Sequence, residues 1–149
     1  MVAIRQAVHG DVSAIERIVR AAYSKYVARI GTPPGPMRDD YAARVAEGTV
    51  WVAIRDGAPV GLVVLIPQPD HLLLDNVAVD PTFQGAGLGR ALLAFAEEWA
   101  RRGGWRELRL YTHDRMTENI ALYRRNGWIE TGRGMQDGFA RVFFRKEVA

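Results

Sequence analysis

Three glycines within five residues join two segments of different periodicity near the middle of the chain. Gly85, Gly87 and Gly89 follow the apolar run Leu72–Val79, which is typical of a buried strand. The residues after the first two glycines repeat at helical spacing, and one helical face carries Leu88, Ala91, Leu92, Phe95 and Trp99. A strand that turns through glycines into a helix needs a sheet for that helix to cover. The chain is therefore predicted to have an α/β fold, with a parallel crossover through this helix.

The other strands are predicted from apolar runs and turn residues. Residues 49–55, 59–67 and 72–79 are expected to form three consecutive antiparallel strands, with a hairpin turn at Asp56-Gly57. The polar pair Asp75-Asn76 interrupts the third of them. Further strands are expected over 2–8, 107–112, 128–131 and 139–148, with the last two joined across 132–138.

Helices are predicted in four places, which completes the order β-α-α-β-β-β-α-β-α-β-β. The first begins at Asp11 as its N-cap and ends near Gly31, and the second covers 39–47. The third follows the glycines and ends at Gly103. The fourth covers 116–126, with Thr117 as its N-cap.

The composition limits what the protein can do. Its 149 residues fit one domain, 1–149, and the lack of cysteine excludes disulfides, thiolate nucleophiles and Cys-ligated metals. No apolar run approaches the ~20 residues of a membrane helix, and no signal peptide is visible, so a cytoplasmic protein without a membrane partner is expected. A net charge of +3, with scattered arginines, suits an anionic ligand and gives no support to nucleic-acid binding.

The glycine segment is a candidate anion site. Free N–H groups and the helix dipole at a helix start favour a phosphate, and Arg90 adds a positive charge there. The dinucleotide-binding and P-loop patterns both fail, because Arg90 replaces the last glycine of the first and the second lacks its lysine. On these residues alone, an ordinary glycine-rich turn remains an equal alternative.

Two segments together resemble one enzyme family. Gln84-Gly85-Ala86-Gly87-Leu88-Gly89 matches the Q/R-x-x-G-x-G/A motif of the GNAT superfamily, the acyl-CoA-dependent N-acyltransferases. Asn119, Tyr123 and the pair Gly127-Trp128 resemble the second motif of this family. The resemblance implies a mixed, mostly antiparallel, twisted sheet of about seven strands with a splayed central pair, flanked by about four helices.

The resemblance also implies acetyl-CoA as co-substrate. Its pyrophosphate would lie on the turn 84–90, and its pantetheine arm would pair with the strand backbone of 77–79. A backbone N–H near Val77 would polarise the thioester carbonyl, and Asp75-Asn76 lies where the bulge that opens the family's sheet is expected. The implied cofactor residues are Val77, Ala78, Val79, Gln84, Gly85, Ala86, Gly87, Leu88, Gly89, Arg90 and Asn119.

Two residues are candidates for the chemistry. Tyr123 is the candidate acid that protonates the departing thiolate, since a phenol stays protonated at neutral pH. Asn119, four residues earlier on the same helical face, would bind the cofactor. Asp75 is the candidate base, although a polar residue at a bulge explains it equally well. Without the resemblance, a half-buried helical tyrosine would explain Tyr123.

The acceptor side is predicted around the first helix and residues 31–38. Tyr23, Tyr26, Met37 and Asn76 are the candidate substrate-binding residues, and Tyr41 could join them. Alternatively, Tyr26 belongs to the core and the others to a mobile lid. Metal binding is not expected from the three histidines, and His113 is predicted to lie on the surface.

The predicted activity is N-acetylation of a primary amine on a small molecule or peptide by direct transfer. An acyl-CoA-binding sensor without turnover is the alternative, and a nucleic-acid-binding module is disfavoured. A homodimer through strands of the segment 128–148 is a further expectation.

Overall fold

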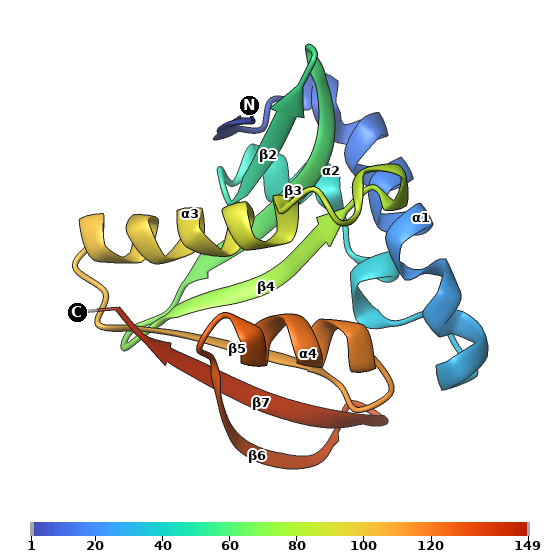
Figure 1. Cartoon of the computed structure of the whole chain (residues 1–149), viewed down its shortest axis with the longest axis vertical. Helices are drawn as coiled ribbons and strands as arrows, with labels where there is room; N and C mark the ends of the chain where they lie inside the picture. The colour runs from blue at the N-terminus through green and yellow to red at the C-terminus, as the bar shows by residue number, and fades with distance from the viewer. Residues whose placement is uncertain (1, 149) are drawn as a thin grey trace.

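Seven strands form one mixed sheet, in the order β1-β2-β3-β4-β5-β7-β6, in a computed structural model that describes residues 2–148 (Figure 1). The strands are β1 (Ala3–Gln6), β2 (Val50–Arg55), β3 (Ala58–Pro67), β4 (Leu72–Val79), β5 (Glu107–His113), β6 (Ile129–Gln136) and β7 (Phe139–Glu147). The helices are α1 (Val12–Ile30), α2 (Tyr41–Ala46), α3 (Leu88–Arg102) and α4 (Thr117–Arg125), with 3-10 turns η1 (His9–Asp11), η2 (Gly35–Arg38) and η3 (Pro81–Phe83). β4 and β5 are parallel and the other neighbours are antiparallel, which confirms the predicted fold class and the crossover through α3.

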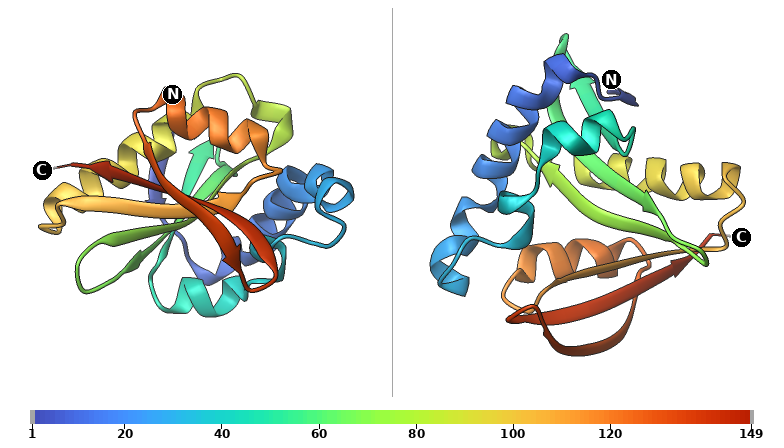
Figure 2. Two further views of the ribbon diagram at one scale, coloured as in Figure 1. Left: turned by 90° about the horizontal axis from the view of Figure 1, so that it is seen from below. Right: turned by 180° about the vertical axis from the view of Figure 1, so that it is seen from behind.

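The helices cover both faces of the sheet. α1 and α2 lie on one face, and α3 and α4 lie on the other (Figure 2). The strand residues divide between these faces by simple alternation: Val50 and Val52 pack towards α1, while Trp51 and Ala53 pack towards α3. Strands buried on both faces read as continuous apolar runs, as β2 and β3 do.

β4 carries a bulge, and beyond it the sheet opens. Val64 of β3 pairs with Asn76, but Leu65 pairs with Leu74, so Asp75 is the extra residue on β4. β4 pairs with β5 only at Leu72 and Leu73 within the described residues. Beyond Leu73 the two strands no longer pair, and Figure 1 shows β4 and β5 diverging. The splayed central pair is thus confirmed, at the predicted position.

The C-terminal hairpin differs from its prediction. β6 runs to Gln136 instead of ending near residue 131, and the turn is the pair Asp137-Gly138. Both turn residues have positive φ, 52° and 80°, as a two-residue hairpin turn of this kind requires. The prediction was wrong because glycines are typical of loops. Here a register shift before Gly132 accommodates the glycines of β6, which is an edge strand.

Two predicted helix caps also differ. Asp11 precedes α1, but its carboxylate accepts hydrogen bonds from the N–H of Val8 (2.8 Å) and from Arg5 (2.7 and 3.0 Å) instead of capping the helix. Thr117 is the first residue of α4, and its hydroxyl donates to Glu118 at 2.9 Å. In both places a nearby charged side chain engages the polar group expected to cap the helix.

α3 packs closely on β3, and this contact gives a test of the fold. Leu92 is fully buried, and a Cβ built at Gly61 would lie 3.1 Å from its Cδ1. Leu92→Ala should lower the free energy of unfolding by about 2–5 kcal/mol, because the cavity left behind cannot collapse. Leu92→Met keeps the volume and should lose less than about 1.5 kcal/mol. Urea unfolding measures both; a loss below about 1 kcal/mol for Leu92→Ala would contradict this packing.

Candidate functional site

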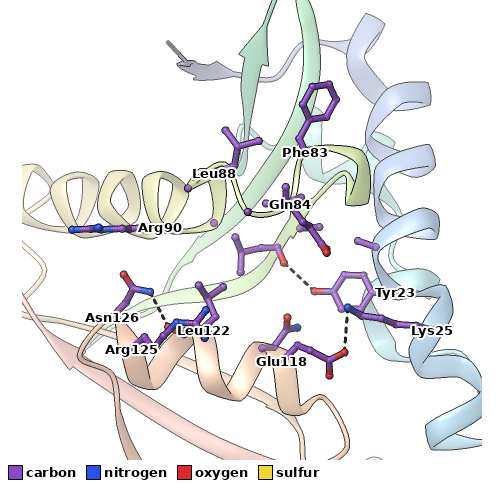
Figure 3. Close-up of a pocket in the computed structure, with 18 of the residues that line it drawn as sticks. Tyr23, Lys25, Phe83, Gln84, Leu88, Arg90, Glu118, Leu122, Arg125 and Asn126 are labelled. Atoms are coloured by element: carbon purple, nitrogen blue, oxygen red, sulfur yellow. Dashed lines mark hydrogen bonds and ion pairs between the residues drawn. The ribbon is translucent and has the colours of Figure 1, made fainter.

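The candidate site is built from two cavities along the opening between β4 and β5. The larger, here called the glycine-turn cavity, has a volume of ≈ 690 Å³ and is drawn in Figure 3. Its lining comes from α1, β4, the turn before α3, and α4 (Figure 3). Of the predicted cofactor residues, it contains Val77, Ala78, Val79, Gln84, Gly85, Gly87, Leu88, Gly89, Arg90 and Asn119. Ala86 is the member of that set outside the lining.

The glycine turn presents backbone to this cavity. Gly87 precedes α3 in the left-handed region (φ 79°), which an L side chain adopts only with strain. A Cβ built there would meet no atom within 4 Å, so the space in front of the turn is open. The first N–H groups of α3, a helix of 15 residues, have no partner within the helix. This end of the cavity therefore offers hydrogen-bond donors and the positive end of a dipole.

The charges around the glycine-turn cavity are mainly positive. Lys25, Arg90 and Arg125 line it together with one carboxylate, Glu118. Arg29 of α1 donates two hydrogen bonds to Glu118 (2.6 and 3.1 Å), and Lys25 lies 3.4 Å from it (Figure 3). These contacts lower the pKa of Glu118 to about 2, so it stays ionised. The remaining net positive charge suits an anionic ligand.

Tyr26 belongs to the hydrophobic core and also lines the glycine-turn cavity. Tyr26 lies on α1 and is almost fully buried, and the cationic groups of Lys25 and Arg29 lie over its ring. Its hydroxyl is buried and has no hydrogen-bond partner in the described residues, and the residue is part of the lining of the glycine-turn cavity. Burial raises the pKa of this phenol to about 12. A buried hydroxyl without a partner is costly, so a ligand that bonds to it would gain affinity.

The second cavity lies on the far side of the bulge and is called here the β5–β7 cavity. Its volume is ≈ 310 Å³. It shares the lining residues Tyr23 and Asn119 with the glycine-turn cavity, so the two cavities are adjacent. Its other lining residues are Gly35, Pro36, Arg38, Asp39, Arg44, Leu74, Asp75, Asn76, Tyr111, Thr112, His113, Met116, Tyr123 and Arg141.

A chain of hydrogen bonds fixes the wall between the two cavities. The buried Tyr23 hydroxyl donates to Oδ1 of Asn76 (2.5 Å) and lies 3.1 Å from the carbonyl oxygen of Val77. Nδ2 of Asn76 donates to the Tyr41 hydroxyl (2.9 Å), which donates to the carbonyl of Pro36 (2.5 Å). α1, the bulge and η2 are thereby tied together, and the predicted residues Tyr23 and Asn76 lie at their junction.

Tyr123 lies at the inner end of the β5–β7 cavity. It is 4% exposed, and its ring packs on Trp128 and Phe144, with centroids 6.0 and 5.8 Å away. Burial raises its pKa well above that of a free phenol, and the nearby Tyr26 adds to this effect. Tyr123 therefore keeps its proton at neutral pH and can donate it.

Asp75 and His113 are two further titratable groups in the lining of the β5–β7 cavity. Burial and the neighbouring Asp39 raise the pKa of Asp75, against the opposing effects of Arg44 and Arg141. His113 is only 7% exposed, so its predicted surface position was wrong. Nδ1 of His113 accepts a hydrogen bond from the N–H of Arg115 (3.0 Å), and burial lowers its pKa. At neutral pH the cavity thus holds an uncharged imidazole.

Local sequence patterns predicted only part of the lining of the β5–β7 cavity. Met37 packs in the core beneath α1 and lines neither cavity. Asp39, Arg44, Tyr111 and Arg141 line the β5–β7 cavity and were not among the predicted site residues. The available signal was Arg141 itself, a charged residue inside the apolar stretch of β7.

Two further features bear on earlier expectations. Across residues 2–148, no group of three or more histidine, aspartate and glutamate side chains is arranged to hold a metal ion. The expectation of a metal-free site stays a prediction. No helix in the described part of the chain is long and apolar enough to cross a membrane.

Comparisons with known proteins agree with this geometry. The model of the acetyltransferase (GNAT) family matches residues 13–128. Aminoglycoside N(6')-acetyltransferase type 1 of Stenotrophomonas maltophilia is 35% identical over 98 residues, which cover 59% of this chain and 64% of the relative. Probable N-acetyltransferase 14 of Xenopus tropicalis is 32% identical over 108 residues, covering 70% of this chain and 52% of the relative. The chain thus matches between half and two thirds of the length of these curated relatives.

Solved structures share the fold over almost the whole chain. The PaiA N-acetyltransferase of Thermoplasma acidophilum, solved in complex with coenzyme A, superposes with a TM-score of 0.82 at 18% identity, over 99% of both chains. The ribosomal-protein-S18-alanine N-acetyltransferase of Escherichia coli gives 0.79 at 23% identity, over 100% of this chain and 95% of that one. Because the family model spans more than half of the sequence, from α1 to the residue before β6, this chain belongs to the GNAT family of acetyltransferases.

Proposed function

We propose that the protein is an N-acetyltransferase that moves an acetyl group from acetyl-CoA directly to a primary amine of a small molecule or peptide. One observation carries this proposal: two cavities of different character lie side by side, with Tyr23 and Asn119 in the lining of both, beside the part of β4 that does not pair with β5. One is suited to a long anionic ligand and the other to a small polar one. Relatives named for aminoglycoside and for peptidyl-lysine acetylation support both acceptor types.

The residues of the glycine-turn cavity fit acetyl-CoA. The N–H groups of the turn 84–90 and the positive end of α3 would hold the pyrophosphate, with Arg90 beside it. The backbone of 77–79 would pair with the amides of the pantetheine arm, as an added strand pairs with a sheet edge. Asn119 and the unpartnered Tyr26 hydroxyl would add hydrogen bonds. When bound, acetyl-CoA supplies an activated thioester.

The backbone of Val77 is suited to polarise the carbonyl of that thioester. Its carbonyl oxygen bonds to Tyr23 and not to β3. The N–H and C=O of one residue in an antiparallel strand point to the same side, so the Val77 N–H also faces the opening. A fixed backbone donor in a site shielded from water stabilises developing negative charge on oxygen.

The proton transfers are assigned to Asp75 and Tyr123. Asp75 takes a proton from the ammonium group of the acceptor, which frees the nitrogen lone pair to form the C–N bond. Tyr123 donates its proton to the sulfur as the C–S bond breaks and the electron pair leaves with sulfur. As the amide forms, its nitrogen loses a second proton, which returns to Tyr123. Asp75 releases the proton that it accepted to water. The products are the acetamide, free CoA and one proton.

Two other expectations stay proposals. A homodimer through the C-terminal strands is supported by β6, the outer strand, on which Ile129 and Met135 are 59% and 74% exposed. A cytoplasmic location also stays a prediction.

A sensor module without turnover would need neither a buried proton donor nor a carboxylate in the second cavity, so the enzyme is favoured.

Cofactor binding is tested first by thermal unfolding. Acetyl-CoA at 100 times its dissociation constant should stabilise the protein by about 2.7 kcal/mol, a rise in Tm of several degrees. Gly87→Trp fills the front of the turn and should abolish the rise. Gly104→Trp is the matched control, because Gly104 has the same positive φ (81°) and open surroundings at the other end of α3. An equal rise in both variants would place the ligand elsewhere.

Tyr123→Phe tests the proton donor. The chemical step, measured in a single turnover, should slow by about 10²- to 10⁴-fold, because the sulfur then leaves without a positioned proton. The acetyl-CoA-induced rise in Tm should change little, since Tyr123 is not part of the glycine-turn cavity lining. An unchanged rate of the chemical step removes Tyr123 from this role.

The pH dependence tests Asp75. Only the ionised carboxylate accepts a proton, so kcat/KM should fall as the pH falls through the pKa of Asp75. Burial raises this pKa above the usual value of about 3.9, so the fall begins at a higher pH than for an exposed carboxyl. Asp75→Asn should remove this limb of the profile together with most of the activity. His113→Gln should retain it; loss of the limb in that variant instead would assign the base to His113.

A further inference from the structure

Arg141 is a buried cation whose bonding capacity is largely unused. It lies on β7, lines the β5–β7 cavity and is 9% exposed. Its guanidinium carbon lies 4.5 Å from the ring centroid of Tyr111 and 4.9 Å from that of Phe139, so two aromatic rings hold it in place. Its buried Nε–H has no hydrogen-bond partner, and no carboxylate of residues 2–148 forms an ion pair with it.

The other charged groups of the cavity are engaged, with one exception. Arg44 pairs with Asp39 at 3.1 Å, and Arg38 donates to the hydroxyl of Thr32 at 2.5 Å. Asp75, like Arg141, forms no ion pair in the described part of the chain, and the two are close enough for Arg141 to lower the pKa of Asp75. One cation and one carboxylate therefore face the same small space without direct partners. Burying such groups is costly unless a ligand compensates them.

We propose that the acceptor is a small molecule that carries a carboxylate as well as the amine, with the amine beside Asp75 and the carboxylate on Arg141. This inference rests on the proposed function, since it describes the acceptor of that reaction. The planar guanidinium presents a fork of N–H donors that matches a carboxylate with two parallel hydrogen bonds. The rings of Tyr111 and Phe139 fix the plane of that fork in advance, which reduces the entropy lost on binding.

The size of the cavity agrees with this class of acceptor. Its volume of ≈ 310 Å³ lies at the lower end of the range for small-molecule sites. Asp75 and Arg141 line this one cavity from β4 and β7, on opposite sides of the opening. Free amino acids and related amino carboxylates have both groups within one short molecule. An amine without an acid would leave Arg141 unpartnered, so it should bind less well.

The experiment compares L-amino acids with their amides and with the amines that lack the carboxylate. Thiol release from acetyl-CoA gives kcat/KM for each, and the best acid should exceed its amide by at least tenfold. Arg141→Met should reduce that ratio at least tenfold, mainly through KM, because the contact forms before the chemistry. Arg145→Met is the control: Arg145 is also on β7, but its side chain is 41% exposed, pairs with Glu107 and Glu147, and lines neither cavity, so the ratio should persist.

Several outcomes separate this inference from the proposed function. Loss of the acetyl-CoA-induced rise in Tm would defeat the proposed function itself. If that rise is intact and amides react as fast as acids, the acceptor needs no carboxylate and the inference is overturned. If no compound reacts, thermal unfolding of the CoA-loaded protein with acids and amides decides, and equal shifts overturn the inference. Arg141→Met should melt no lower than the wild type, since it removes a buried unpartnered donor. A lower Tm with equal losses for acids and amides would show a structural role instead.

Discussion

The bulge at Asp75 is the constraint on which the rest of the structure depends. A regular β4 would place Leu72, Leu74 and residue 76 on one face, but the extra residue lets Leu74 and Val77 share the α3 face instead. Pairing between β4 and β5 ends after Leu73, two residues before the bulge. Both cavities adjoin the opening that results. The carboxylate of Asp75, in the middle of an apolar strand, thus lines a cavity. Without the opening of the sheet, it would be buried in the core.

The two cavities differ in the kind of groups that line them. The glycine-turn cavity has main-chain hydrogen-bonding groups at the start of α3 and along β4, together with polar side chains such as those of Arg90 and Asn119. The main-chain groups are fixed by secondary structure and keep their geometry when surface side chains change. The β5–β7 cavity is lined by residues of many elements, from α1, η2, α2, β4, β5, α4 and β7. The family's shared cofactor and its varied acceptors are consistent with this difference.

The fold and the glycine turn could be predicted from local patterns. Alternation, helical spacing and the turn residues gave most elements, and Asp75-Asn76 marked the bulge. The β5–β7 cavity could not be predicted in the same way. It depends on β7 inserting between β5 and β6, which brings Arg141 opposite His113 although 28 residues separate them. Met37 shows a different limit. The position of its loop was predicted correctly, but local sequence does not indicate which side chains of a loop face the core.

One contact between α1 and α4 has a kinetic consequence. Arg29 and Lys25 hold Glu118 across the glycine-turn cavity, and all three side chains are about 40% exposed. Ion pairs as exposed as these contribute only about 0–1 kcal/mol and weaken as salt screens them. The contact is therefore a weak link between α1 and α4 beside the cavity. Entry and escape of a ligand should accelerate with ionic strength, while the attraction of an anionic ligand to the surrounding cations declines, so salt would set the exchange rate through two opposing effects.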